Sequence, residues 1–276
     1  MPSVSMTSPP CDTCPAYAQL AQMGLKLDQF DRVIALAGNP NTGKSTVFNT
    51  LTGLKQHTGN WPGKTVTRAE GGYQYNGVRY KLVDLPGTYS LLSASEDEEV
   101  ARNFILFGQP DCTIVVTDAT ALERNLNLVL QVLEITDKAV VAVNLMDEAR
   151  RKGLEIDIRS LSRDLGVPAI PMAAREGEGI QALLGAVAEV CEGAVKTDPL
   201  RVGGTPTFQR AVEQLVAQIS RVYPGIPNAR WLAIRLLDGD SRVQQAMLDG
   251  EIAELVAGQR RSEVQFSRKM AVAGRQ

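Results

Sequence analysis

The sequence predicts an α/β fold, in which a doubly wound, mostly parallel sheet with one antiparallel edge strand is followed by a small all-α domain. Short apolar runs of strand character alternate with helical patterns between residues 31 and 194, as in a parallel sheet covered by helices. The dipeptide Asn76-Gly77 separates two such runs and favours a tight hairpin turn, which makes one strand antiparallel. Beyond the Pro/Gly-rich stretch 196–206, only helical periodicities occur.

The individual elements follow from local signals. The run 32–38 is β-rich and ends in glycine, which is typical of a buried parallel strand. A helix over 44–53 ends at Gly53, and the polar residues 54–65 form a loop. The other predicted strands are 65–75, 78–84, 112–119, 139–145 and 167–172. The other predicted helices are 95–107, 121–136, 157–165, 179–193, 206–222, 228–237, 240–257 and 260–270.

These elements divide the chain into a flexible leader, 1–30, an α/β domain, 31–194, and a helical domain, 195–276. The leader has no cationic start followed by an apolar core, so it does not resemble a secretory signal. No apolar run approaches the roughly 18–20 residues that a membrane span requires. We therefore expect this chain to be soluble and cytoplasmic.

Composition and charge argue against several classes of function. The net charge is −2, so no broad basic surface is expected and no nucleic-acid partner is predicted. Four cysteines and one histidine argue against an all-protein zinc site. Cys11 and Cys14 form a lone CxxC in the leader, where a disordered thiol pair is favoured over a redox or metal role.

The stretch "GNPNTGKS" fits the phosphate-loop pattern G-x-x-x-x-G-K-[ST] and lies between a predicted strand and a predicted helix. Glycines allow backbone N–H groups to turn inward, and the helix N-terminus adds positive potential, so such a loop binds polyphosphate. Lys44 would reach the β- and γ-phosphates, and the Ser45 hydroxyl would bind magnesium. The candidate residues of this loop are Gly38, Asn39, Pro40, Asn41, Thr42, Gly43, Lys44, Ser45 and Thr46.

A second candidate segment, Asp84, Leu85, Pro86 and Gly87, ends the strand 78–84. A carboxylate at this strand end, beside the phosphate loop, is suited to hold magnesium through water. The Gly87 N–H could meet the γ-phosphate. Many GTPases carry a water-orienting glutamine directly after this glycine, but here the position is Thr88. The sequence therefore predicts a nucleotide switch without the usual catalytic glutamine.

The motif "NLMD", Asn144, Leu145, Met146 and Asp147, predicts which base is bound. A carboxylate at Asp147 can accept both the N1–H and the N2 amino hydrogens of guanine, a donor pair that adenine lacks, so GTP is favoured over ATP. The alternative is that Asp147 is only a helix N-cap. A last loop, Ala173, Ala174 and Arg175, lies where related proteins carry S-A-[KR] beneath the guanine carbonyl, and here alanine replaces the serine.

Together, "GNPNTGKSTVFNTLTG", "GNWPGKTV", "DLPGTYSL" and "NLMD" resemble the cytosolic GTPase portion of the FeoB family of bacterial ferrous iron transporters. The resemblance covers residues 31–180, and the helical segment up to about 270 is similar to that family's regulatory domain by position and pattern. It implies a P-loop GTPase, a slow GTP-hydrolysing switch in iron transport. It also implies a polytopic membrane iron-permease domain as partner and a place at the cytoplasmic face of the bacterial inner membrane. Self-association is left open.

The same resemblance implies roles for further residues. Thr65 would contact magnesium and the γ-phosphate, with Thr67 as the rival candidate. Asn41 would coordinate an activating potassium ion, which would supply positive charge where other GTPases use an arginine. The implied catalytic residues are Asn41, Lys44, Thr65 and Gly87. The residues implied for the first switch loop are Gly63, Lys64, Thr65, Val66 and Thr67.

Several alternatives stay open at this point. The chain could be a potassium-activated GTPase of ribosome or tRNA maturation, or a P-loop kinase or ATPase. Trp61 could shield a cation or anchor the first switch loop. The acidic run 96–99 could bind iron, although acidic residues in the first turn of a helix commonly complement its dipole.

Overall fold

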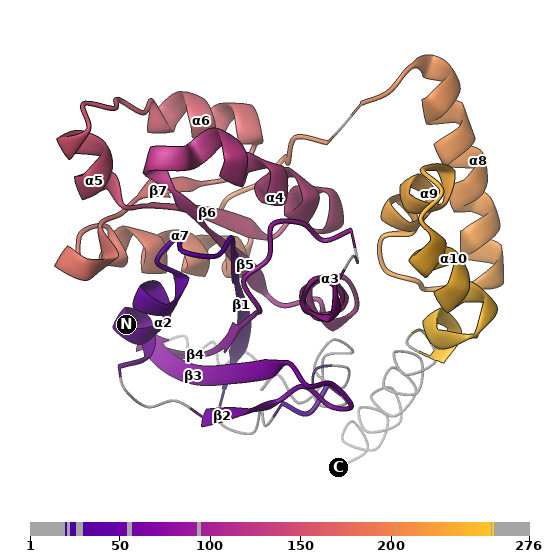
Figure 1. Cartoon of the computed structure of the whole chain (residues 1–276), viewed down its shortest axis with the longest axis horizontal. Coiled ribbons are helices and arrows are strands. Elements are labelled where there is room, and N and C mark those ends of the chain that lie inside the picture. The colour runs from indigo at the N-terminus through magenta and orange to yellow at the C-terminus, as the bar shows by residue number, and fades with distance from the viewer. Residues whose placement is uncertain are drawn as a thin grey trace, which may run out of the picture.

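The computed structural model describes residues 20, 23–25, 30–53, 57–92, 95–201, 203–254 and 256. Figure 1 shows a central sheet with helices packed on it and a further group of helices at one side. The seven strands lie in the order β2-β3-β4-β1-β5-β6-β7. Their bounds are β1 Arg32–Gly38, β2 His57–Asn60, β3 Thr67–Tyr75, β4 Val78–Asp84, β5 Cys112–Asp118, β6 Ala139–Asn144 and β7 Ala169–Pro171.

The sheet is mostly parallel, which confirms the predicted fold class. Strands β4, β1, β5, β6 and β7 pair in parallel, and β3 is antiparallel to β4 through the turn at Asn76 and Gly77. The prediction of a loop over 54–65 is wrong in part, because β2 lies within it and pairs with β3. All four residues of β2 are exposed. Backbone pairing therefore extends the sheet without any apolar pattern in the sequence.

The helices of the α/β domain are α2 Lys44–Thr52, α3 Glu96–Gly108, α4 Leu122–Ile135, α5 Met146–Arg151, α6 Ile158–Leu165 and α7 Ile180–Glu192. They are followed by α8 Pro206–Val222, α9 Ala229–Leu237 and α10 Ser241–Leu248. Helix α5 was not predicted, and α10 is shorter than the predicted 240–257, although residues 251–254 are again helical. The predicted helix 260–270 lies outside the described residues. None of the helices that the structure describes is both long and apolar enough to cross a membrane.

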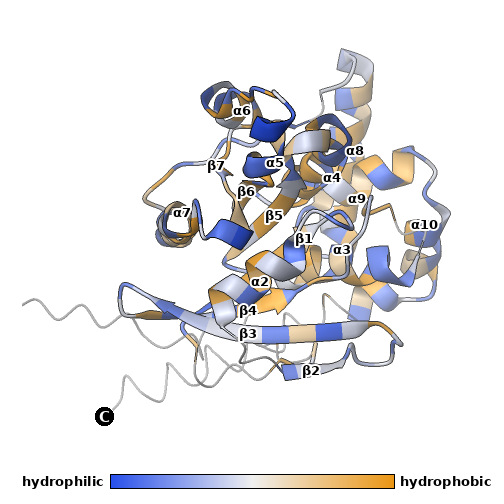
Figure 2. Cartoon of the chain, turned by 60° about the vertical axis from the view of Figure 1, so that its left-hand side comes forward, coloured by the Kyte–Doolittle hydropathy of each residue, from blue (hydrophilic) through white to orange (hydrophobic). Residues whose placement is uncertain are grey.

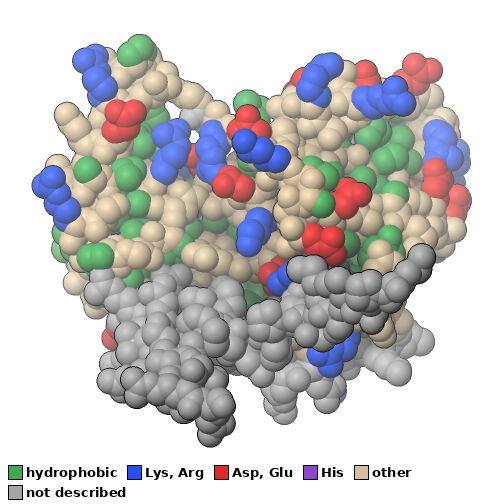
Figure 3. Space-filling view, turned by 180° about the vertical axis from the view of Figure 1, so that it is seen from behind, with side chains coloured by type: hydrophobic (Ala, Val, Ile, Leu, Met, Phe, Trp, Pro, Cys, Tyr) green, Lys and Arg blue, Asp and Glu red, His purple; other side chains and the backbone are tan. Residues whose placement is uncertain are grey.

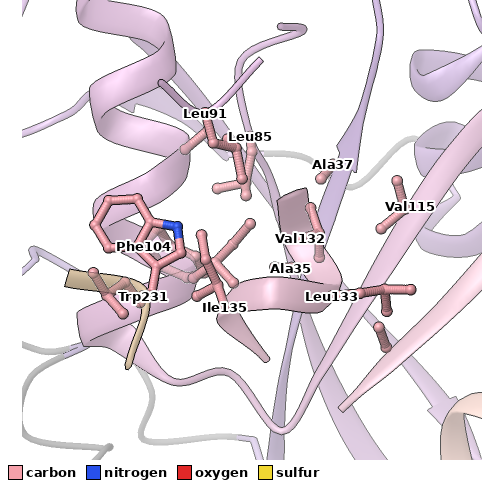
Figure 4. Packing of buried hydrophobic residues seen from close by; sticks show 14 of the residues in the cluster. Ala35, Ala37, Leu85, Leu91, Phe104, Val115, Val132, Leu133, Ile135 and Trp231 are labelled. Carbon is pink, nitrogen blue, oxygen red and sulfur yellow. The ribbon is translucent and has the colours of Figure 1, made fainter. Parts of the chain in front are cut away.

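The sheet separates two hydrophobic clusters. Successive side chains of β1 alternate between them, because neighbouring strand residues point to opposite faces. Ile34 and Leu36 pack in the cluster beneath α2 and α7. Ala35 and Ala37 face the larger cluster with α3 and α4, part of which is shown in Figure 4. In Figure 2, β5 is largely hydrophobic, as expected for a strand buried on both faces, whereas β2 is hydrophilic.

The helical segment docks on the α3 and α4 side of the sheet. Trp231 of α9 is 4% exposed and belongs to the same cluster as Phe104 of α3 (Figure 4). The Asn228 side chain adds a polar link. Its Nδ2 donates to the carbonyls of Glu134 (2.7 Å) and Ile135 (2.7 Å) at the end of α4, and its Oδ1 accepts from the Trp231 N–H (3.0 Å). One side chain therefore caps two helices from different parts of the chain.

Residues 196–201, which follow α7, form neither helix nor strand. The Asp198 N–H donates to the Gly166 carbonyl, and the Leu200 N–H donates to the Leu165 carbonyl, each at 2.9 Å. The segment therefore lies along the end of α6. The division into 1–30, 31–194 and 195–276 stays a prediction, and most of the leader lies outside the described residues.

We expect the Asn228 cap to stabilise the docked helices. Asn228→Asp keeps the acceptor for the Trp231 N–H but loses both donors to α4, so it should lower the free energy of unfolding by about 1–3 kcal/mol. Asn228→Ala should cost at least as much, because it also loses the acceptor and must adopt the positive φ of 46°. Urea unfolding followed by circular dichroism measures both. Unchanged midpoints in both variants would contradict this role.

Candidate nucleotide-binding site

Four of the predicted loops meet at one edge of the sheet. These loops follow β1, β4, β6 and β7. Because the four strands are parallel, their carboxyl ends lie at the same edge of the sheet. The Thr88 N–H donates to the Gly38 carbonyl (3.3 Å), which joins the second segment to the phosphate loop. Asn144 donates from Nδ2 to the Thr42 carbonyl (2.9 Å) and accepts at Oδ1 from the Ala174 N–H (3.0 Å). The structure thus brings the phosphate loop, the Asp84 segment, the NLMD motif and the last loop into contact.

The phosphate loop has the backbone that the glycine pattern predicts. Asn41 (φ 65°) and Gly43 (φ 80°) both adopt left-handed conformations. Gly43 is the N-cap of α2 and provides no side-chain hydrogen bond, so the first N–H groups of that helix lack a side-chain cap. A Cβ at Gly43 would lie 2.4 Å from Asn144 Nδ2, so only glycine fits there. The loop therefore offers N–H groups and helix-dipole potential to an anion.

Asn39 is the least satisfied residue of this loop. It is 3% exposed, and neither its Oδ1 nor its Nδ2 has a hydrogen-bond partner among the described residues. Its carbonyl accepts from the Thr42 hydroxyl (2.9 Å). A buried amide without partners is costly, which is consistent with a site shaped for a ligand.

Lys44 and Asp84 form a largely buried ion pair. The Lys44 ammonium donates to Asp84 Oδ1 and to the Leu85 carbonyl (2.7 Å), and the two side chains are 11% and 18% exposed. Burial raises the pKa of the Asp84 carboxyl, and the positive charge of Lys44 opposes that rise. The residues predicted to hold phosphate and magnesium are therefore together, but in this structure they bind each other.

The structure places the first switch loop against α3. Residues 61–66 close the hairpin between β2 and β3, with hydrogen bonds from the Trp61 N–H to the Val66 carbonyl and from the Lys64 N–H to the Trp61 carbonyl. The Thr65 hydroxyl donates to Glu96 Oε2 (3.0 Å). In the part of the chain that the structure describes, no hydrogen bond joins Thr65 to the phosphate loop or to Asp84. The rival candidate Thr67 is exposed at the start of β3.

Trp61 anchors this loop. Its side chain is 5% exposed, and its ring lies edge-on to Phe104 with centroids 5.3 Å apart. The Arg68 guanidinium lies 5.2 Å from the centroid of the same ring. The indole is thus packed between a β3 side chain and α3, which favours the anchoring alternative over a cation shield.

The acidic run at the start of α3 is engaged by side chains of this chain. Glu96 accepts from Thr65, and Glu99 pairs with Lys64 (3.3 Å) and with Arg242 of α10 (2.6 Å). Burial by itself would raise the pKa of Glu99, but Arg242 and Lys64 outweigh it and hold that pKa below its usual range. Glu99 is therefore a charged junction between the first switch loop and the helical segment.

The NLMD motif starts α5. Leu145 takes a left-handed φ of 62° and is the N-cap, so the alternative that Asp147 is an N-cap is wrong. Asp147 lies in the first turn, and its carboxylate pairs with Arg151 (3.0 Å), an exposed partner. In the last loop, the Ala174 N–H is already bonded to Asn144, and Arg175 is exposed. Among Asp147, Ala174 and Arg175, the Asp147 side chain is the one whose oxygens can accept hydrogen bonds from a base.

Sequence reasoning missed Glu96, Glu99 and Arg242 as partners of the first switch loop. Arg242 is 143 positions from Glu99, and no local pattern marks either residue as half of a pair. The spacing of Ser95 and Glu98 is typical of a helix start, and the Ser95 hydroxyl accepts from the Glu98 N–H (3.3 Å). Like the acidic run 96–99, this pattern indicates where α3 begins and not which side chains it contacts.

Comparison with known proteins identifies relatives of both parts of the chain. A family model described as "Ferrous iron transport protein B" matches residues 32–187, and another, "FeoB cytosolic helical domain", matches residues 206–270. The "Fe(2+) transporter FeoB" of Shigella flexneri and that of Escherichia coli strain K12 are each 40% identical over 217 residues. That of Salmonella typhimurium strain LT2 is 41% identical over 211 residues. Each match covers 75% of this chain and 27% of the relative, so the chain spans about a quarter of the length of these proteins.

Solved structures give the same result. The cytosolic domain of T. maritima FeoB in apo form has a TM-score of 0.72 and 32% identity, and the match covers 86% of this chain and 96% of that one. The cytosolic domain of L. pneumophila FeoB has a TM-score of 0.68 and 35% identity, covering 82% and 97%. A mutant of S. thermophilus NFeoB bound to mGDP has a TM-score of 0.71 and 33% identity, covering 86% and 90%.

The ion pair at the site predicts how Asp84 titrates. Its pKa should lie above the usual aspartate value, and Lys44→Met should raise it further, because the opposing positive charge is lost. A carboxyl whose native pKa exceeds its unfolded pKa favours folding most at low pH, and this contribution declines as the pH rises through the interval between the two values. Carbon-13 NMR titration of the carboxyl measures the shift, with Asp84→Asn to assign the resonance. An identical titration in Lys44→Met would contradict the pairing.

Proposed function

This chain belongs to the FeoB ferrous iron transport family, and from that premise we propose that it is a GTP-binding switch that hydrolyses GTP slowly and regulates ferrous iron uptake. The observation that carries the proposal is the joining of the phosphate loop, the NLMD motif and the last loop at one sheet edge through Asn144, with the Asp84 segment beside them. The GDP-bound relatives support a guanine nucleotide as ligand. Because the match covers only 27% of these relatives, we propose a polytopic membrane iron-permease domain as partner and a place at the cytoplasmic face of the bacterial inner membrane.

Binding of the triphosphate would exchange partners within the site. The N–H groups at the start of α2 would hold the phosphates, and Lys44 would leave Asp84 and the Leu85 carbonyl for phosphate oxygens. That exchange would free the Asp84 carboxylate. The Ser45 hydroxyl and the Asp84 carboxylate are hard oxygen donors that fit magnesium, with Thr65 added after the loop moves. Magnesium, when bound, would neutralise charge on the β- and γ-phosphates.

Hydrolysis would proceed without a glutamine. Thr88 is 5% exposed and its N–H is bonded to Gly38, and a threonine hydroxyl is too weak a base to take a proton from water. Gly87 packs against Pro40 of the phosphate loop, because a Cβ built on it would lie 3.6 Å from the Pro40 Cα. We therefore assign the positioning of water to main-chain groups of the two switch segments. Slow turnover follows from that assignment.

Asn41 is the proposed potassium ligand. Its side chain is exposed at the left-handed turn of the phosphate loop, and no described residue forms a hydrogen bond with it. An amide oxygen in that position could hold a monovalent cation against the phosphates. Potassium would supply positive charge to the transferring phosphoryl group, as an arginine does in other GTPases.

The helical domain would transmit the switch. Lys64 of the first switch loop pairs with Glu99, and Glu99 pairs with Arg242, which also pairs with Glu251 (2.9 Å). Movement of the loop would take the Lys64 ammonium away from Glu99 and leave Glu99 paired with Arg242. The position of α10 on α3 would therefore respond to the nucleotide.

A GTPase of ribosome or tRNA maturation is not favoured. Both matching family models belong to iron transport. On the face seen in Figure 3, basic and acidic side chains are interspersed, which does not favour a nucleic-acid partner.

Nucleotide preference tests the binding assignment. The chain should bind GTP far more tightly than ATP, and Asp147→Ala should weaken GTP binding roughly 30- to 150-fold, which is about 2–3 kcal/mol for hydrogen bonds to a charged group. Calorimetric titration with GTP and ATP measures both. The matched control is Asp164→Ala, an exposed aspartate on α6, which should change neither affinity. Equal affinities of the unmodified chain for GTP and ATP would refute a guanine-specific switch.

Cation dependence tests the catalytic assignment. GTP hydrolysis should be at least about tenfold faster in potassium than in sodium, because the cation stabilises developing charge. Asn41→Ala and Asn41→Gly should both lose this stimulation, and Asn41→Asp should retain part of it. The glycine variant matters because Asn41 has a positive φ, so loss in the alanine variant alone would indicate backbone strain rather than a missing ligand. Equal rates in both buffers would remove the potassium assignment and leave nucleotide binding intact.

A further inference from the structure

A short stretch that precedes the family match packs on the first switch loop. We call Leu20 and residues 23–25 the leader turn; the first family match begins at residue 32. Leu20 and Leu25 are 2% and 5% exposed and belong to the hydrophobic cluster that contains Trp61. The Leu25 N–H donates to the Leu20 carbonyl (3.1 Å), which closes the turn. The leader turn is therefore part of the packed core.

Arg68 of β3 binds the leader turn directly. Its Nη1 donates to the Met23 carbonyl (2.7 Å), and its Nη2 donates to the Gly24 carbonyl (3.0 Å). The same guanidinium lies over Trp61 and pairs through Nε with Glu70 (2.7 Å). One arginine thus joins the leader turn to the anchor of the switch loop, with a fork geometry that lysine cannot reproduce.

Gly24 makes the closest approach to the loop itself. It has a φ of +83°, and a Cβ built on it would lie 3.1 Å from Pro62 Cγ and 3.2 Å from Arg68 Nη1. Pro62 belongs to the loop 61–66 that carries Thr65. The backbone of the leader turn therefore lies against the loop, and an added Cβ would fit only if Pro62 or Arg68 shifted slightly.

The loop is held from two directions in this structure. The leader turn contacts Pro62, while Glu96 and Glu99 of α3 bind Thr65 and Lys64. A GTP-bound loop would require Thr65 to leave Glu96 for the phosphate. Any such movement of the loop also disturbs the contact between Pro62 and Gly24.

We propose that the leader turn is an intramolecular clamp on the first switch loop, and that it competes with the loop position that GTP requires. This inference rests on the proposed function. The contact forms in the loop position described above and would be lost in the GTP-bound position. It therefore lowers the apparent affinity for GTP and leaves the affinity for GDP unchanged. By reciprocity, GTP weakens the docking of the leader turn.

The test weakens the clamp from the leader side. Gly24→Ala introduces a methyl group against Pro62 and alters no residue of the nucleotide site. Gly153→Ala is the matched control, because Gly153 has a similar φ of +69° with nothing within 4 Å of the added Cβ. Arg68→Lys weakens the same contact from β3 and keeps a positive charge beside Glu70. All variants are made in the full chain.

Two measurements decide the proposal. Without nucleotide, hydrogen exchange of a peptide covering residues 61–66 should be roughly three- to tenfold faster in Gly24→Ala and Arg68→Lys, and unchanged in Gly153→Ala. With magnesium and a non-hydrolysable GTP analogue, the same two variants should bind the analogue several-fold more tightly, with GDP affinity unchanged. Unchanged exchange in the loop would overturn the clamp. Faster exchange without tighter binding of the analogue would overturn the competition.

A failure of the proposed function would be distinguishable from a failure of the clamp. In that case the unmodified chain would bind no guanine nucleotide, and the competition would fall with it. The exchange experiment needs no nucleotide, so it still decides whether the leader turn restrains the loop.

Discussion

The buried amide of Asn144 is the interaction on which the candidate site depends. Asn144 is 1% exposed. Its side-chain amide donates to the Thr42 carbonyl of the phosphate loop and accepts from the Ala174 N–H of the last loop. The loops that follow β1, β6 and β7 are thereby fixed relative to one another. The close approach also explains why Gly43 must lack a side chain. Because the partners are main-chain groups buried with the amide, the loss of either hydrogen bond would leave a desolvated backbone atom unpaired.

Around this fixed centre, residues predicted to bind phosphate or magnesium are paired with other side chains of the protein. Lys44 binds Asp84, and Thr65 binds Glu96. In the proposed switch, each of these pairs would exchange a protein partner for a phosphate oxygen or a metal ion. Both states of such a switch would satisfy the hydrogen bonds of these groups, so neither state would leave a buried polar group unpaired.

The same logic extends to the helical segment. Trp231 and Asn228 hold it on α3 and α4 through packing and main-chain hydrogen bonds that do not involve the switch loops. Glu99, by contrast, is shared between Lys64 and Arg242. In the proposed switch, the first part of this interface would stay unchanged, and the second would depend on where the first switch loop lies. That division would let α10 respond to the loop without separating from the sheet.

Several features can be read directly from the order of residues: the alternation of strands and helices, the hairpin at Asn76-Gly77, the phosphate loop and the order of the candidate motifs. These features are local, because glycine placement, turn residues and apolar periodicity set backbone conformation and burial within a few residues. Other features became visible in the folded chain alone: β2 extends the sheet although its residues are exposed, Trp61 is buried, and Thr65 contacts Glu96 rather than Asp84. The folded chain also brings Arg242 to Glu99. Ion pairs such as Arg242 with Glu99, and the pairing of an exposed edge strand, depend on which surfaces the fold brings together. The partners can be far apart in the chain, so no short pattern of residues predicts them.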